Sequence, residues 1–247
     1  MSRVRLLEVA DAEELSRRAA EEFVRRARGR RFSVALAGGS TPRRLYQLLA
    51  DAPYREQVNW TQVEFFFGDE RTVPPDHADS NFRMANDALL AQLDLPDRQI
   101  HRMAGERDDL DAAAAEYANE IGKVLGGTPP AFDLVLLGMG RDGHTASLFP
   151  GTAALSERRR WVVPNLVPQL DTRRLTLTVP ILNHAACLLF LVAGAEKREA
   201  LAAVLEGPRA PERFPSQLIR PEHGELLWLV DRAAAAALSE TMKEQLR

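Results

Sequence analysis

The feature that most constrains the fold of this chain is the regular alternation of short apolar, β-rich runs with longer segments of helical periodicity. Patterns of buried strands lie at 32–37, 63–67, 132–137, 187–192 and 226–230, and a half-buried strand pattern lies at 175–179. Such alternation from end to end is typical of βα units wound onto a mostly parallel sheet. We therefore expect an α/β fold, with a single domain over residues 1–247, a mostly parallel Rossmann-like sheet and helices on both faces.

The helical segments have recognisable beginnings and ends. Thr41-Pro42 supplies an N-cap residue followed by proline at the first helical position, and Ser80-Asn81 opens another helix. Apolar residues at three- and four-residue spacing continue that helix to Leu93 and define a further one over 110–124, which Gly126-Gly127 ends. Segments 196–205 and 232–246 are also predicted to be helical.

Composition excludes several classes of protein. The chain has 247 residues, 45% of them hydrophobic, with 32 Lys and Arg against 35 Asp and Glu, so it lacks the basic excess of a nucleic-acid-binding protein. Its N-terminus has no apolar stretch, and its longest apolar run is far below the ~20 residues that span a bilayer. We expect no nucleic-acid or membrane partner and a cytoplasmic location. The one cysteine, Cys187, lies in an apolar run and is interpreted as a core residue.

Three motifs follow predicted strands, at the edge where open α/β sheets bind their ligands. The first is Gly38-Gly39-Ser40-Thr41-Pro42. Its two glycines permit close approach of the backbone to a ligand, and the helix that follows presents unpaired N–H groups to an anion. A phosphate cradle and an ordinary strand-to-helix turn fit this motif equally well.

The second motif is the triplet Asp69-Glu70-Arg71, which follows the strand at 63–67 and precedes Ser80-Asn81. An acid pair beside an arginine suits sugar hydroxyls and a charged group. Taken alone, such a cluster is more often part of a solvated turn.

The third motif covers residues 138–150 and has the sequence Gly-Met-Gly-Arg-Asp-Gly-His-Thr-Ala-Ser-Leu-Phe-Pro. Its glycines formally satisfy the G-x-G-x-x-G pattern of dinucleotide-binding sites. The context argues against a dinucleotide. Pro150 stops the segment that should form the pyrophosphate-binding helix, and Val162-Val163-Pro164-Asn165 stands where a ribose-binding acid should end a strand. We therefore expect no nicotinamide cofactor.

His144 has the strongest functional signature of the five histidines. It follows Asp142 in this strand-end loop, whereas the other four are too scattered for a local metal-ligand pattern. The sequence contains no Gly-x-Ser-x-Gly elbow and no His-Glu-x-x-His pair. We expect His144 and Asp142 to be catalytic and no metal to be bound.

Together the three motifs, with Ser80-Asn81 after the second, resemble the signatures of the 6-phosphogluconolactonases, in that family's order and over essentially the whole chain. The related glucosamine-6-phosphate deaminases share the Gly-x-Asp-Gly-His core but continue with an Ala-Phe-Asn-Glu-Pro-like ending and carry an Asp-Glu-Tyr-like triplet. This chain has Ala-Ser-Leu-Phe-Pro at 146–150 and an arginine at Arg71. The resemblance thus favours the lactonase branch.

The resemblance implies hydrolysis of 6-phospho-D-glucono-1,5-lactone to 6-phospho-D-gluconate, a step of the oxidative pentose phosphate pathway, with no cofactor. A δ-lactone is an activated ester, so neutral His144 would suffice as the general base for water, with Asp142 either orienting it or binding a sugar hydroxyl. The family's phosphate-binding cations match Arg173 and Lys197, and Arg174 competes with Arg173. The residues expected to hold the substrate and its phosphate are Gly38, Gly39, Ser40, Thr41, Asp69, Arg71, Arg173 and Lys197.

Two other functions stay open at this point. A glucosamine-6-phosphate deaminase would share the fold and the phosphate site, and the ending at 146–150 argues against it. A non-catalytic sugar-phosphate sensor would usually carry an output module, for which the length leaves no room. We expect a small phosphosugar lactone as the partner and a monomer or weak homo-oligomer. Segment 207–215, rich in proline and charge, is predicted to be a surface loop or a mobile lid.

Overall fold

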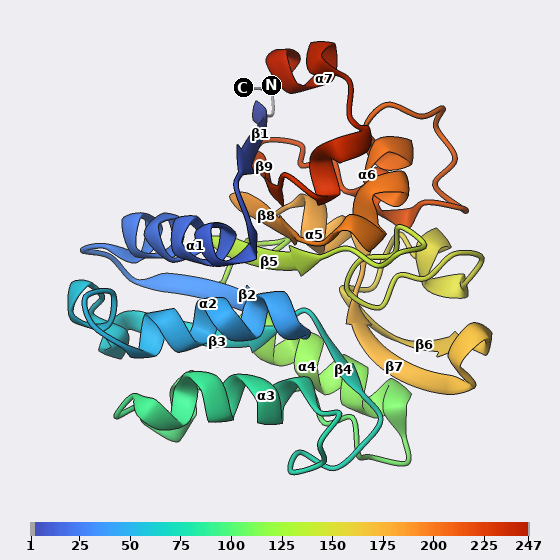
Figure 1. The fold of residues 1–247 in the computed structure, drawn as a ribbon. Helices are drawn as coiled ribbons and strands as arrows, with labels where there is room; N and C mark the ends of the chain where they lie inside the picture. Colours follow the sequence, from blue (N-terminus) through green and yellow to red (C-terminus); the bar gives the residue numbers. More distant parts are fainter. Residues whose placement is uncertain (1–2, 247) are drawn as a thin grey trace.

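The computed structural model describes residues 3–246, and at its centre lies a six-stranded sheet in which every strand pairing is parallel (Figure 1). Across the sheet the strands are β1 (Arg3–Val9), β9 (Glu225–Asp231), β8 (Cys187–Val192), β5 (Leu134–Gly138), β2 (Phe32–Leu36) and β3 (Val63–Phe67). The chain leaves β2 toward one edge and β5 toward the other. The strand order therefore reverses between β2 and β5, and open α/β sheets bind ligands at such a switch point.

Helices cover both faces of this sheet, as the side chains of β3 demonstrate. Phe65 stacks on Trp60 and Phe67 packs on Phe82, whereas the intervening Phe66 packs edge-on against Tyr117 on the opposite face. The helices are α1 (Ala12–Ala27), α2 (Ser40–Ala50), α3 (Asn81–Ala88), α4 (Leu110–Leu125), α5 (Val179–Asn183), α6 (Arg198–Leu205) and α7 (Glu240–Gln245). The predicted fold class, a mostly parallel α/β sheet flanked by helices, is confirmed.

A second sheet, which the sequence did not predict, lies beyond the carboxyl ends of the parallel strands (Figure 1). It consists of β4 (Asp69–Arg71), β7 (Thr172–Leu177) and β6 (Val162–Val167), paired antiparallel in that order. Because β4 starts two residues after β3 ends, the second motif itself becomes part of this sheet.

Several predicted boundaries were wrong. The helix expected over 232–246 is broken, because the chain is extended at Leu238 and Ser239 caps the separate helix α7. The strand expected at 175–179 is β7, which begins three residues earlier, and the helix α5 already starts at Val179. The helix expected to run to Leu93 ends at Ala88. Strand β1 and helix α1 were not anticipated.

The interior contains Cys187, as expected, and its environment makes it unreactive. The side chain is fully buried in β8. Burial raises the pKa of the Cys187 thiol to about 12, so the thiolate is scarce at neutral pH.

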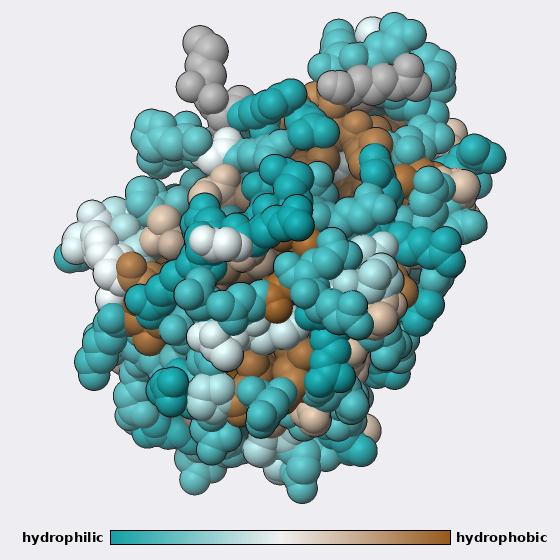
Figure 2. Space-filling model, turned by 90° about the vertical axis from the view of Figure 1, so that its left-hand side faces the viewer, coloured by the Kyte–Doolittle hydropathy of each residue, from teal (hydrophilic) through white to brown (hydrophobic). Residues whose placement is uncertain are grey.

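The surface at the amino ends of the parallel strands is largely hydrophilic, with apolar side chains in separate small patches (Figure 2). Among the α-helices within residues 3–246, none combines the length and the hydrophobicity that crossing a membrane requires.

Candidate active site

The three sequence motifs meet at the carboxyl ends of β2, β3 and β5, beside the switch point of the sheet. A cavity of about 220 Å³ lies there, and a wider one of about 510 Å³ shares part of its wall. The residues that line both are Asp69, Arg71, Gly140, His144, Ala146 and Lys197. Segments more than 120 residues apart in the chain thus contribute polar groups to one space.

The first motif forms the junction between β2 and α2. Helix α2 begins at Ser40, and Gly39, with a φ of 108°, occupies the N-cap position. The Thr41 cap predicted from the sequence is therefore wrong: Thr41 lies inside the first turn, and no side chain caps this helix in the described part of the chain. The first-turn N–H groups stay available to an anion. Gly38 and Gly39 line the cavity, whereas Ser40 and Thr41 are not among its lining residues in the described structure.

His144 and Asp142 form the pair predicted from the third motif. His144 Nδ1 lies 2.6 Å from Asp142 Oδ1, and the backbone N–H of His144 donates to the same oxygen at 3.2 Å. Burial would raise the pKa of Asp142, but the hydrogen bond and charge of His144 outweigh this and hold it below its usual range. Because Nδ1 is engaged, Nε2 is the nitrogen left to exchange a proton with a ligand or water.

The ring of His144 has a second support that sequence reasoning missed. Phe149, from the same motif, stacks on it with ring centroids 4.0 Å apart and an interplanar angle of 25°. Gly140 lies against both members of the pair, because a Cβ at this position would lie 2.1 Å from His144 Nδ1 and 2.5 Å from Asp142 Oδ1. The loop therefore fits closely around the pair. In the same loop, Ala146 adopts a positive φ of 46°.

The second motif divides between two faces of β4. Asp69 lines the cavity and accepts a hydrogen bond from Ser147 Oγ at 2.6 Å. Glu70 points the other way and caps α3, because its carboxylate accepts the backbone N–H groups of Asn81 and Phe82 at 2.7 and 2.8 Å. Burial raises the pKa of Glu70, and these donors counter the shift. Glu70 is thus a structural cap, and Asp69 faces the ligand space.

The structure places Arg174, and not Arg173, at the cavity. In the pairing of β4 with β7, Arg71 lies directly opposite Arg174. Arg174 is half-buried and lines the wider cavity, whereas Arg173 is exposed and lines neither cavity. Burial and the adjacent positive charge of Arg71 lower the pKa of Arg174.

Lys197 brings a further cation from the opposite side of the switch point. It ends the short 3₁₀ turn η7 (Ala195–Lys197) after β8 and lines both cavities. Burial and the positive charge of Arg141 lower the pKa of Lys197, while Glu196 and Asp142 oppose the shift. Four cationic side chains therefore line the same space as His144: Arg71, Arg141, Arg174 and Lys197.

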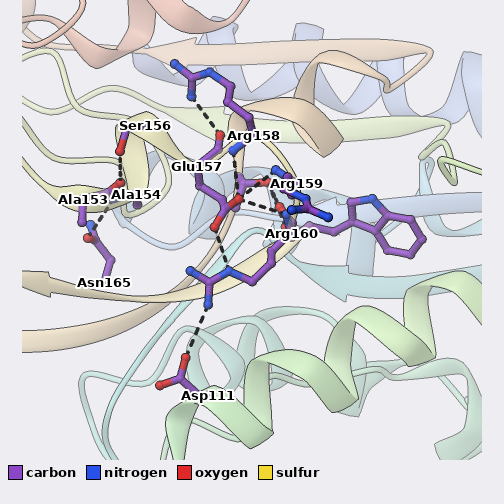
Figure 3. Close-up of polar contacts among 11 residues, drawn as sticks. Asp111, Ala153, Ala154, Ser156, Glu157, Arg158, Arg159, Arg160 and Asn165 are labelled. Atoms are coloured by element: carbon purple, nitrogen blue, oxygen red, sulfur yellow. Dashed lines mark hydrogen bonds and ion pairs between the residues drawn. The ribbon is translucent and has the colours of Figure 1, made fainter.

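The chain behind the third motif is fixed by the carboxylate of Glu157 (Figure 3). Glu157 Oε1 accepts the backbone N–H groups of Arg158, Arg159 and Arg160 at 2.9, 2.8 and 3.1 Å, and Oε2 accepts Arg160 Nε at 2.7 Å. The Arg159 and Arg160 donors lower the pKa of Glu157 to about 2. This run of arginines is therefore a turn organised around its own glutamate.

Asn165 connects β6 to the third motif. Its side chain is buried, and its Nδ2 donates to Ser147 O at 2.8 Å and to Thr152 Oγ1 at 3.0 Å. Ser147 in turn holds Asp69, so a chain of hydrogen bonds leads from β6 to the cavity wall.

The segment 207–215 is a surface loop that forms hydrogen bonds with the residues that follow it. Gln217 accepts the backbone N–H of Ala210 at 2.6 Å and donates to Pro208 O at 3.1 Å. At its end, Ser216 donates through both its backbone N–H and its hydroxyl to Gly143 O in the third motif. These contacts fasten the loop against the site.

The family relationship follows from comparison with known proteins. The family model described as glucosamine-6-phosphate isomerases/6-phosphogluconolactonase matches residues 10–228. The chain belongs to this family. A Synechocystis protein named 6-phosphogluconolactonase is 44% identical over 210 residues, which cover 83% of this chain and 84% of that protein.

Solved structures of this family share the fold. The 6-phosphogluconolactonase from Trypanosoma cruzi is 33% identical, with a TM-score of 0.83 over 97% of this chain and 98% of that one. A monomeric glucosamine-6-phosphate deaminase is 26% identical, with a TM-score of 0.81 over 94% and 99% of the two chains. The fold is therefore common to both activities, and the residues of the site must distinguish them.

Proposed function

We propose that this protein hydrolyses 6-phospho-D-glucono-1,5-lactone to 6-phospho-D-gluconate. The observation that carries the proposal is the His144–Asp142 pair at a cavity that also receives Lys197, Arg71 and Arg174. His144 can act as a base on a neutral lactone carbonyl, and these three cations can bind the phosphate of the same substrate. The 44% identical relative named 6-phosphogluconolactonase supports the same reaction.

His144 acts as general base in this proposal. Its Nε2 takes a proton from water as the water oxygen attacks C1 of the lactone, while Asp142 holds Nδ1. The tetrahedral intermediate then collapses with cleavage of the bond from C1 to the ring oxygen, and Nε2 returns the proton to that oxygen. The product acid ionises, so each turnover releases one proton near neutral pH. Neither a metal nor a covalent nucleophile is required, because the lactone is already activated.

The phosphate lies at the cationic side of the cavity. Lys197 and Arg174 approach it from opposite sides, and the uncapped N-terminus of α2, with Gly38 and Gly39, adds backbone donors. Arg174 takes the role that the sequence assigned to Arg173, since only Arg174 lines the cavity. This remote anchor orients the lactone without touching the bond that breaks.

The decisive assay follows proton release from freshly prepared 6-phosphogluconolactone, with spontaneous hydrolysis subtracted and a chelator present. We expect chelator-resistant hydrolysis that falls by roughly 10²- to 10⁴-fold in kcat when His144 is changed to Gln. An unchanged kcat in a folded His144→Gln variant would refute the role of the base.

The same protein is assayed for ammonia release from glucosamine 6-phosphate, because the deaminase shares the fold. The arginine at Arg71 and the Ser147-Leu148-Phe149-Pro150 ending favour the lactonase. Ammonia release without lactone hydrolysis would establish the deaminase reaction instead.

A further inference from the structure

Asp231 is a buried carboxylate that lines neither cavity and yet touches the turn that carries Lys197. It is the last residue of β9, next to the end of β8, and the residue is 5% exposed. Both carboxylate oxygens accept the backbone N–H of Gly194, at 3.1 and 3.0 Å. Oδ1 also accepts the N–H of Ala234 at 2.8 Å.

The turn that Asp231 holds leads directly to Lys197. Gly194 adopts a φ of 100°, a conformation that other residues rarely adopt, and its carbonyl accepts the backbone N–H of Lys197 at 3.0 Å. The N–H of Gly194 is fixed by Asp231, and its carbonyl begins η7. Hydrogen bonds through Gly194 therefore connect Asp231 to the turn that carries Lys197.

We infer that Asp231 is a positioning residue for the phosphate specificity of this site, acting through Lys197. The inference rests on the proposed function, in which Lys197 binds the 6-phosphate. A buried carboxylate is costly unless it is hydrogen-bonded, and here its bonds hold the Gly194 turn and Ala234 on η9 (Ala234–Ala237). Asp231 fixes the Gly194 turn against η9 and so keeps the ammonium of Lys197 at the cavity. Asp231 itself does not contact the ligand.

The first test compares Asp231→Ala with the parent on 6-phosphogluconolactone and on unphosphorylated glucono-1,5-lactone. We expect KM for the phosphorylated lactone to rise roughly tenfold, below the ~10²-fold that a displacement of 1 Å can cost. The effect on the unphosphorylated lactone should be several times smaller. Asp231→Asn keeps one acceptor oxygen and the side-chain volume, so its KM for the phosphorylated lactone should lie between those of the parent and Asp231→Ala. It replaces the alanine variant in the test if that variant does not fold.

The second test repeats Asp231→Ala in a Lys197→Met background. If Asp231 acts through Lys197, the alanine substitution adds little to the loss of phosphate preference already caused by Lys197→Met. The matched control is Asp133→Ala: Asp133 also accepts a backbone N–H, that of Ser33 at 2.8 Å, but at the amino end of β5, away from the site. Its substitution should leave the ratio of the two KM values unchanged.

Equal losses on both lactones, or a full additional loss in the Lys197→Met background, would overturn the inference while leaving the lactonase reaction intact. If the parent protein hydrolyses neither lactone, the proposed function is wrong. Calorimetry with 6-phosphogluconate and gluconate then decides the inference. Asp231→Ala must weaken binding of the phosphorylated acid selectively, and equal binding of the two acids by the parent refutes it.

Discussion

Replacing Arg174 with Met should stabilise the protein and weaken its binding of phosphosugars, whereas replacing its neighbour Arg173 should do neither. The two residues are adjacent on β7, but only Arg174 lines the cavity and lies opposite Arg71. The pair therefore offers a matched control within one strand, with the same change of charge at both positions.

The expected magnitudes follow from the surroundings of Arg174. Its Nε is buried and has no hydrogen-bond partner among the described residues, and the charge of Arg71 adjoins it. An unsatisfied buried polar group costs about 1–3 kcal/mol, part of which methionine recovers while filling the space. We expect a gain of about 1 kcal/mol in the free energy of unfolding, or about 2–4 °C in Tm. Loss of a charge-assisted hydrogen bond to phosphate costs about 1.5–3 kcal/mol, hence a roughly 10- to 100-fold weaker Kd.

The assay is thermal unfolding with and without 6-phosphogluconate, together with the lactone kinetics. The Arg174→Met variant should melt higher than the parent without ligand and gain less from added 6-phosphogluconate. The Arg173→Met variant should stay within about 0.5 kcal/mol of the parent in both respects. If Arg173→Met weakened phosphosugar binding and Arg174→Met did not, the assignment by strand register would be refuted.

Two further predictions concern Gly140, beside the His144–Asp142 pair, and Glu157, in the turn that follows the third motif. Gly140→Ala should lower kcat by at least about tenfold, because its Cβ would lie 2.1 Å from His144 Nδ1; a wild-type rate in a folded variant would contradict this close fit. Glu157→Gln should lower the free energy of unfolding at pH 7 and flatten its acid dependence. The pKa of Glu157 is lowered to about 2, so its contribution is present above its ordinary pKa of 4.5 and is lost as the pH falls toward 2. Urea unfolding at pH 7, 4.5 and 3 measures this, and parallel pH profiles of the two proteins would count against it.

The parallel sheet was predictable because each of its buried strands is a short and mostly apolar run. The predicted strand at 63–67 coincides with β3, and that at 187–192 coincides with β8. Strand β1 was missed since it lies at an edge and its burial pattern is mixed. Strand β4 was missed for a different reason: three charged residues form it, and only pairing with β7 makes them a strand.

The candidate site was predictable to the extent that its residues lie within local motifs. His144 and Asp142 are two residues apart, so their pairing depends on the loop alone. Asn165 and Asp231 were not predicted as parts of the site, because their partners lie 18 and 37 residues away. The contact of Asp231 with Gly194 depends on β8 and β9 being neighbours in the sheet, and no local pattern contains that information.

The pairing register of β4 with β7 determines which charged side chains of these two strands face the cavity. Residues directly opposite each other in an antiparallel pair point to the same face, and successive residues point to opposite faces. Arg71 pairs with Arg174 and Asp69 pairs with Thr176, so these four share the face toward the cavity. Glu70 must then face α3, which it caps. By the same alternation Arg173 must face away from the cavity, although its sequence neighbourhood is as basic as that of Arg174. The roles proposed for these side chains thus depend on the pairing of two short strands about a hundred residues apart. Composition and motif spacing contain no information on that pairing, so they could not separate Arg174 from Arg173.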